Sequence, residues 1–217
     1  LARWGTAALS KFNGMFGLAL WDRKEQTLLL ARDRYGIKPL YFAKQGHFFA
    51  FASEQKAITA LPAFKQKLNK SALLEYFTFQ NIFTDNTLLE DVSMLPAGYF
   101  GKLHVKTGQW EKHQYWDFHF QEPSNKSNKK EYEEELERLF KQSVNRQLVC
   151  DVELGAYLSG GMDSGSITAL AAEKIPNLKS FTIGFDLSSA SGLEMAFDER
   201  VKAEAMSALF KTEHYEM

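Results

Sequence analysis

The pattern of apolar residues in this 217-residue chain changes in the middle, and this change limits the folds that the chain can adopt. Before the change, apolar residues alternate or form short runs between turns, as in antiparallel strands. Residues 121–128 then contain no apolar residue except Pro123. Beyond them, Tyr132 and Leu136 begin a run of apolar residues at helical spacing. We therefore predict two domains, 1–120 and 131–217, with a linker at 121–130.

The first domain is predicted to be α+β with antiparallel strands. Its second hairpin carries Gly46 in a turn made of Lys44, Gln45 and Gly46. Ser53 and Asn69 are predicted to cap two short helices. The predicted strands are 16–21, 27–32, 41–43, 47–52, 99–105 and 109–116, and the predicted helices are 54–61 and 70–77.

The second domain is predicted to be α/β with a parallel sheet. Strand-like and helix-like segments alternate in it, which is the pattern of βαβ units. In such open sheets, ligands bind at the carboxyl ends of the strands. The predicted helices are 129–148, 166–174 and 198–210, and the predicted strands are 154–158, 180–185 and 212–217.

A string of small and polar residues follows the first strand of the second domain, and it reads SGGMDS at 159–164. Gly160 and Gly161 allow positive φ angles and close approach to an anion. The N–H groups of the following helix start favour phosphate there, and the hydroxyls of Ser159 and Ser164 can donate to it. The string differs from the P-loop and from the dinucleotide fingerprint. It predicts a pyrophosphate loop.

Asp163 needs a separate explanation, because a carboxylate repels phosphate. A Mg²⁺ ion held between the carboxylate and a polyphosphate resolves the conflict. The alternative is that Asp163 is only the N-cap of the helix.

Three segments of the first domain resemble the second half of a class II glutamine amidotransferase domain. They are FNGMFGLALWD at 12–22, ARDRYGIKPLY at 31–41 and FASEQKA at 51–57. The SGGMDS loop and SFTIGF at 180–185 resemble the ATP-pyrophosphatase synthetase domain that follows it. In this order, the two modules resemble glutamine-hydrolysing asparagine synthetases.

The resemblance implies a fold and a reaction. The fold would be part of an Ntn-type glutaminase sandwich, then part of an adenine nucleotide alpha hydrolase-like parallel sheet, both incomplete. The reaction would convert aspartate to asparagine with ATP, through β-aspartyl-AMP and pyrophosphate, using ammonia from glutamine. ATP and Mg²⁺ would be required, and a homodimer is a further expectation. The implied ATP-binding residues are Leu158, Ser159, Gly160, Gly161, Met162, Asp163, Ser164 and Ile183, with Asp163 as the metal ligand.

The chain also departs from this family's pattern. The family's glutaminase nucleophile is an amino-terminal cysteine, but this chain begins with Leu1 and its one cysteine is Cys150. We therefore expect an internal fragment that does not hydrolyse glutamine. The family's later acidic loop is also missing, and Gly165 stands where the family more often has serine.

The net charge, the apolar runs and the cysteine content limit the partners and the location that we expect for this chain. The net charge of −1 gives no sign of nucleic-acid binding, and no apolar run approaches the length of a membrane span. One cysteine cannot form an internal disulfide, so a reducing, cytoplasmic location is expected.

Structural explanations are favoured for several other polar residues. Arg32, Asp33 and Arg34 are predicted to brace the first domain, and Cys150, at a helix end, is predicted to be buried and unreactive. Asp198 and Glu199 open a helix, where acidic residues match the dipole, although in the family an acidic pair lies near the substrate.

Three functions remain open from the residues alone. They are an asparagine synthetase, a related ligase that amidates another acid or closes a β-lactam, and an inactive fragment.

Overall fold

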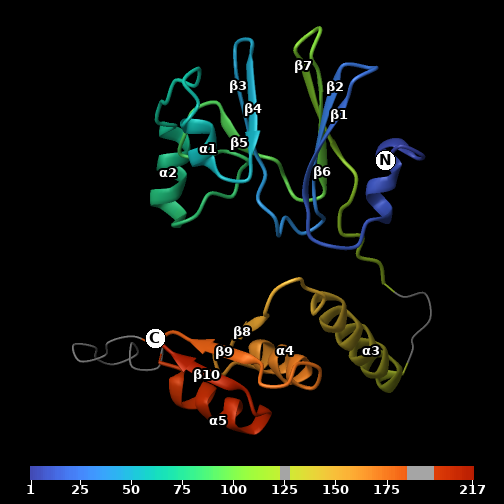
Figure 1. Ribbon diagram of the computed structural model, residues 1–217, viewed down its shortest axis with the longest axis vertical. Coiled ribbons are helices and arrows are strands. Elements are labelled where there is room, and N and C mark those ends of the chain that lie inside the picture. Colours follow the sequence, from blue (N-terminus) through green and yellow to red (C-terminus); the bar gives the residue numbers. More distant parts are fainter. Residues whose placement is uncertain (123–127, 185–197) are drawn as a thin grey trace. The chain divides into compact units, whose positions relative to one another are not determined.

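The computed structural model describes residues 1–122, 128–184 and 198–217, and the chain divides into two compact units (Figure 1). The units are Leu1–Gln121 and Glu122–Met217.

The first unit contains two antiparallel sheets, so the α+β prediction is confirmed for it. A four-stranded sheet has the order β1-β2-β6-β7, and a three-stranded sheet has the order β4-β3-β5. The strands are β1 (Gly17–Asp22), β2 (Thr27–Arg32), β3 (Tyr41–Gln45), β4 (Phe48–Ala52), β5 (Val92–Met94), β6 (Tyr99–His104) and β7 (Gln109–Gln114).

The apolar residues of these strands form two cores. One joins both sheets, with Leu30 of β2 and Phe42 of β3 at its centre and Trp110 of β7 against it. The other lies where the short helix α1 (Gln55–Thr59) packs on β3 and β4, around Ala43 and Ile58. Sheet thus packs on sheet, and a helix covers the far face of the smaller one, which is a layered arrangement.

Two further helices complete the first unit: η1 (Gly5–Lys11), which is a 3-10 helix, and α2 (Lys70–Phe79). Asn69 caps α2 as predicted, because its side chain accepts the N–H of Ala72 at 3.2 Å. The prediction for Ser53 is wrong. The N-cap of α1 is Glu54, and no side chain caps that helix.

The predicted bracing role of Arg32, Asp33 and Arg34 is confirmed. The Asp33 carboxylate is almost fully buried, and the Arg32 guanidinium donates to three main-chain carbonyls. The Arg34 side chain donates to the carbonyl of Ser10 at 2.7 Å. The bonds from Arg32 to Leu95 and from Arg34 to Ser10 join the end of β2 and the loop after it to segments that are distant in sequence.

The second unit contains a three-stranded parallel sheet in the order β10-β9-β8. Its helices α4 and α5 connect the strands and contact one another, and α3 contacts α4. The elements are α3 (Lys129–Gln147), β8 (Gly155–Tyr157), α4 (Met162–Ala172), β9 (Lys179–Thr182), α5 (Arg200–Phe210) and β10 (Glu213–Glu216). No helix in the described parts of the chain is both long and apolar enough to cross a membrane.

Several boundaries differ from the prediction. The turn between β3 and β4 is shorter than predicted, because Gln45 pairs with Phe48 and so belongs to its strand. The strand β5 was not predicted, since three residues give no readable period. Phe185, the predicted end of β9, lies outside the described residues.

The prediction that Cys150 is buried is also wrong, because its thiol-bearing side chain is exposed. The helix α3 ends at Gln147, so Cys150 lies in the connection before β8 and not on a packed helix face.

Candidate nucleotide-binding loop

The candidate loop begins at Leu158, directly after β8. Leu158 is only 1% exposed, and its N–H donates to the carbonyl of Phe181 in β9 at 2.9 Å. Its carbonyl accepts the hydroxyl of Thr182. The start of the loop therefore follows β8 directly and is hydrogen-bonded to β9.

The two glycines of the loop have different conformations. Gly160 has a φ of +70°, which favours glycine, and a Cβ placed on it would lie 2.5 Å from Cβ of Lys202. Gly161 has an extended conformation and is the N-cap of α4. A glycine is therefore required at position 160, because of both its positive φ and the closeness of Lys202. Neither reason applies to Gly161.

The start of α4 leaves main-chain donors available. The first intrahelical bond runs from the N–H of Gly165 to the carbonyl of Gly161, at 3.0 Å. The N–H groups of Met162, Asp163 and Ser164 therefore have no partner within the helix. Together with the helix dipole, they form a site that favours an anion.

The two serines of the loop lie together. The hydroxyls of Ser159 and Ser164 are 3.0 Å apart, and the hydroxyl of Ser164 also accepts the N–H of Ser159 at 3.2 Å. This pairing holds the loop closed on itself and places both hydroxyls beside the start of α4.

Asp163 lies in the first turn of α4 and is exposed. The alternative that it is the N-cap is wrong, because Gly161 occupies that position. No group of three possible metal-ligating His, Cys, Asp or Glu residues occurs in the described parts of the chain. The one exposed carboxylate still fits Mg²⁺, which often takes one or two carboxylates and completes its shell with substrate phosphates.

The apolar residues around the loop divide into buried and exposed ones. Leu158 belongs to the core, whereas Met162 is 82% exposed and Ile183 is 63% exposed. Ile183 directly follows β9, which pairs with β8, so Leu158 and Ile183 come at neighbouring strand ends as predicted. An exposed isoleucine at this edge is available for contact with a ligand.

Gly165 has a packing explanation that its sequence position does not reveal. A Cβ on Gly165 would lie 3.0 Å from the sulfur of Met206, which comes from α5. The small residue therefore lets α5 approach α4. The sequence gives no sign of this contact, because the two residues are far apart along the chain.

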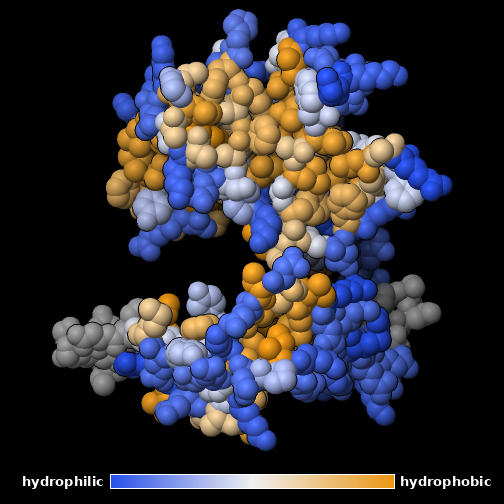
Figure 2. Space-filling view, in the orientation of Figure 1, coloured by the Kyte–Doolittle hydropathy of each residue, from blue (hydrophilic) through white to orange (hydrophobic). Residues whose placement is uncertain are grey.

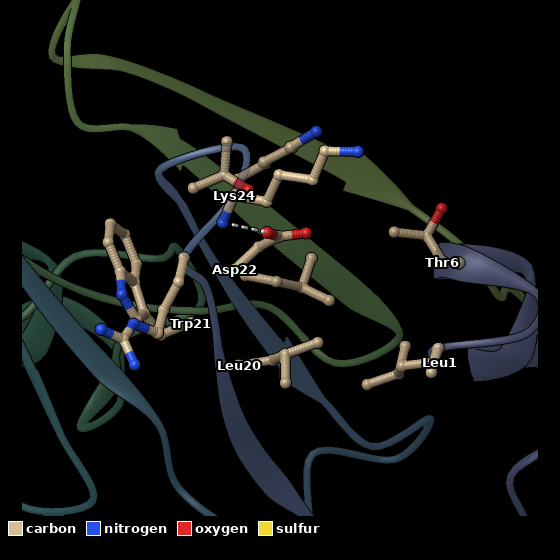
Figure 3. Close-up of a pocket in the computed structure, with 12 residues that line it drawn as sticks. Leu1, Thr6, Leu20, Trp21, Asp22 and Lys24 are labelled. Carbon is tan, nitrogen blue, oxygen red and sulfur yellow. Dashed lines mark hydrogen bonds between the residues drawn. The ribbon is translucent and has the colours of Figure 1, made fainter.

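A cavity with a volume of about 800 Å³ lies elsewhere, in the first unit. Figure 3 shows Leu20, Asp22 and Lys24 on one side of it and Leu1 and Thr6 on the other. The Asp22 carboxylate accepts the N–H of Lys24 at 2.9 Å, drawn as a dashed line.

Comparisons with known proteins decide the family. Residues 1–116 match the glutamine amidotransferase domain family, and residues 135–217 match the asparagine synthase family. This chain belongs to the family of glutamine-hydrolysing asparagine synthetases.

Relatives from several organisms share this similarity. A Mycobacterium bovis protein with a provisional glutamine-hydrolysing asparagine synthetase name is 34% identical over 94% of this chain and 32% of its own length. Asparagine synthetase 3 of Bacillus subtilis is 31% identical over 98% of this chain and 35% of its own length. Amidase chry2 of Gibberella zeae is 28% identical over 87% of this chain and 30% of its own length. The chain thus spans about a third of the length of the relatives that it matches.

Proposed function

We propose that this chain is part of an asparagine synthetase that converts aspartate to asparagine with ATP and glutamine-derived ammonia. Its second unit would bind the polyphosphate of ATP. The observation that carries this proposal is the group of N–H donors at the start of α4 that have no partner within the helix. They follow Gly160, which has a positive φ, and Asp163 lies among them. The family membership supports the choice of substrates.

Each residue of the loop has a role in this proposal. The N–H groups of Met162, Asp163 and Ser164 would bind the phosphates that leave as pyrophosphate. The hydroxyls of Ser159 and Ser164 would add donors. Fixed donors of this kind stabilise the charge that develops on the leaving group, because they need no reorganisation during the reaction.

Asp163 would hold Mg²⁺ against the phosphates, which neutralises part of their charge. Leu158 and Ile183, at the ends of β8 and β9, would contact the nucleoside. In this proposal the second unit is the beginning of an adenine nucleotide alpha hydrolase-like α/β domain, and the first is part of an Ntn-type glutaminase sandwich.

The glutamine-hydrolysing step needs a nucleophile that these residues do not supply. The one cysteine, Cys150, is exposed and belongs to the second unit, not to the amidotransferase-like unit. We therefore propose that the 217 residues alone do not release ammonia from glutamine, and that the parent protein, a cytoplasmic homodimer, does.

A related ligase that amidates a different acid is the second candidate, and the similarity to Amidase chry2 favours keeping it. Release of AMP and pyrophosphate by the full-length protein, measured with aspartate and then with other carboxylic acids, separates the two. Turnover with aspartate as the best acceptor supports the first candidate, and turnover only with another acid supports the second.

Calorimetric titration of Mg·ATP into this chain tests the loop directly. We expect binding that depends on Mg²⁺ and weakens about tenfold in Asp163→Asn, because one charged ligand is lost. Asp151→Asn is the matched control, since Asp151 is also exposed but precedes β8, at the opposite end from the loop. A folded chain that binds no Mg·ATP, or equal weakening in both variants, would contradict the proposal.

A further inference from the structure

The first turn of α5 packs directly against the candidate loop. A Cβ placed on Gly160 would lie 2.5 Å from Cβ of Lys202, 3.3 Å from the main-chain nitrogen of Ala203 and 3.4 Å from the carbonyl oxygen of Glu199. The main chain of the loop and the base of the Lys202 side chain are therefore in contact.

The ammonium group of Lys202 has no anionic partner in the described residues. Lys202 is exposed and forms no ion pair there with Asp163, Glu199 or any other carboxylate. Four other lysines of the second unit, Lys129, Lys130, Lys141 and Lys179, each lie within ion-pair distance of a glutamate. Lys174 and Lys211 have no ion pair in the described residues either, but neither of them lies beside the loop.

The position of Lys202 within α5 is electrostatically unfavourable. It lies in the first turn of the helix, where the dipole is positive and where acidic residues are stabilising. Among the residues that the structure describes, neither helix stability nor a salt bridge explains a lysine there. An anion bound at the loop would explain it, because that anion would offset both the lysine charge and the dipole.

The reach of the side chain fits this explanation. Cβ of Lys202 lies beside the main chain of Gly160. From there, the flexible four-carbon stem of the lysine can carry the ammonium group towards an anion held by the first N–H groups of α4. Apart from Lys202, the loop offers only main-chain dipoles and hydroxyls, and its one charged side chain, Asp163, is negative.

We propose that Lys202 binds the terminal phosphates of ATP and the pyrophosphate product at this loop. The inference rests on the proposed nucleotide-binding function and adds a charged residue from α5 to it. A full positive charge at this place distinguishes a triphosphate or pyrophosphate from AMP, which lacks the terminal phosphates.

The test compares pyrophosphate, Mg·ATP and AMP binding by the chain and three variants. We expect Lys202→Gln to weaken pyrophosphate and Mg·ATP binding about tenfold, because a charge-assisted hydrogen bond is lost. AMP binding should not change, and the salt dependence of pyrophosphate binding should decrease. Lys202→Arg should retain most of the affinity.

Lys174→Gln is the matched control, since Lys174 is exposed and follows the opposite end of α4. A thermal melt of each variant serves as the folding control. Loss of a cation from the positive end of α5 should leave the melting temperature unchanged or raised, so weaker binding cannot come from unfolding.

The possible results separate the inference from the function on which it rests. Equal pyrophosphate affinity in Lys202→Gln and the unchanged chain would overturn the role of Lys202 and leave the loop as a nucleotide site. Equal weakening for AMP would overturn the assignment to the terminal phosphates. No binding of pyrophosphate or Mg·ATP by the folded, unchanged chain would overturn the proposed function as well.

Discussion

At the scale of single residues, Asp33 shows how one buried carboxylate can organise a loop. Its oxygens accept the N–H groups of Phe16, Tyr35, Ile37 and Lys38, at distances between 2.9 and 3.2 Å. Burial acts to raise the pKa of Asp33, but these four donors outweigh it, and the pKa lies below its ordinary value. Charge at Asp33 therefore stabilises the first unit.

Asp33→Ala should lower the free energy of unfolding by about 3 kcal/mol, because several buried N–H groups lose their acceptor. The control is Asp22→Ala, which removes an exposed carboxylate that also accepts main-chain N–H groups. Denaturant unfolding of both variants measures the difference. Equally small decreases in the free energy of unfolding for the two variants would show that the burial of Asp33 does not increase its contribution to stability.

The pH dependence follows from the direction of the same shift. Because the folded pKa is lowered, the contribution of Asp33 is complete above the ordinary value of 3.8 and decreases as the pH falls below it. Acid unfolding of Asp33→Asn should thus show a weaker dependence on pH in this range than the unchanged chain.

At the scale of elements, the β8–loop–α4 segment depends on one glycine more than on the other. Gly160→Ala should destabilise the second unit by about 1–3 kcal/mol, since it combines a positive φ with a collision against α5. Gly161→Ala should cost less than about 1 kcal/mol, because its nearest neighbour is Oγ of Ser159 at 3.4 Å. Denaturant unfolding compares the two, and equal costs would contradict the assignment.

The sequence located this segment well, because its signal is local. A strand, two glycines and a helix start follow one another within eight residues, and α4 begins at Met162, earlier than the predicted 166. The period of α4 alone did not reveal this start. Its first turn is fixed by Gly161 as N-cap and by the packing of α5 on Gly165.

At the scale of the whole molecule, the first unit exposes strand edges and apolar side chains. In the described residues β1 pairs only with β2, and β4 pairs only with β3. Leu20 and Trp21 of β1 are each 43% exposed. Figure 2 also shows hydrophobic residues at the surface over α2, where Leu74 and Phe77 are 69% and 74% exposed. Unpaired edges with apolar side chains favour association.

We therefore predict that the isolated chain associates in a concentration-dependent way. Trp21→Lys should reduce the association, since a charge on an edge strand opposes pairing with another edge. Trp4→Lys is the control, because Trp4 is exposed but lies outside the sheets. Sedimentation velocity over a range of concentrations measures the effect. A monomer at every concentration would contradict the prediction.

The sequence by itself determined the features that depend on neighbouring residues. These are the division near residue 121, the hairpins, the Asn69 cap and the strand–glycine–helix order of the loop. The tertiary structure decided which distant residues meet: Lys202 at Gly160, Met206 at Gly165, and the indole of Trp110 against the ring of Phe42. A local pattern repeats with the period of its own helix or strand, whereas a contact between elements depends on how their backbones pack and leaves no period in the chain.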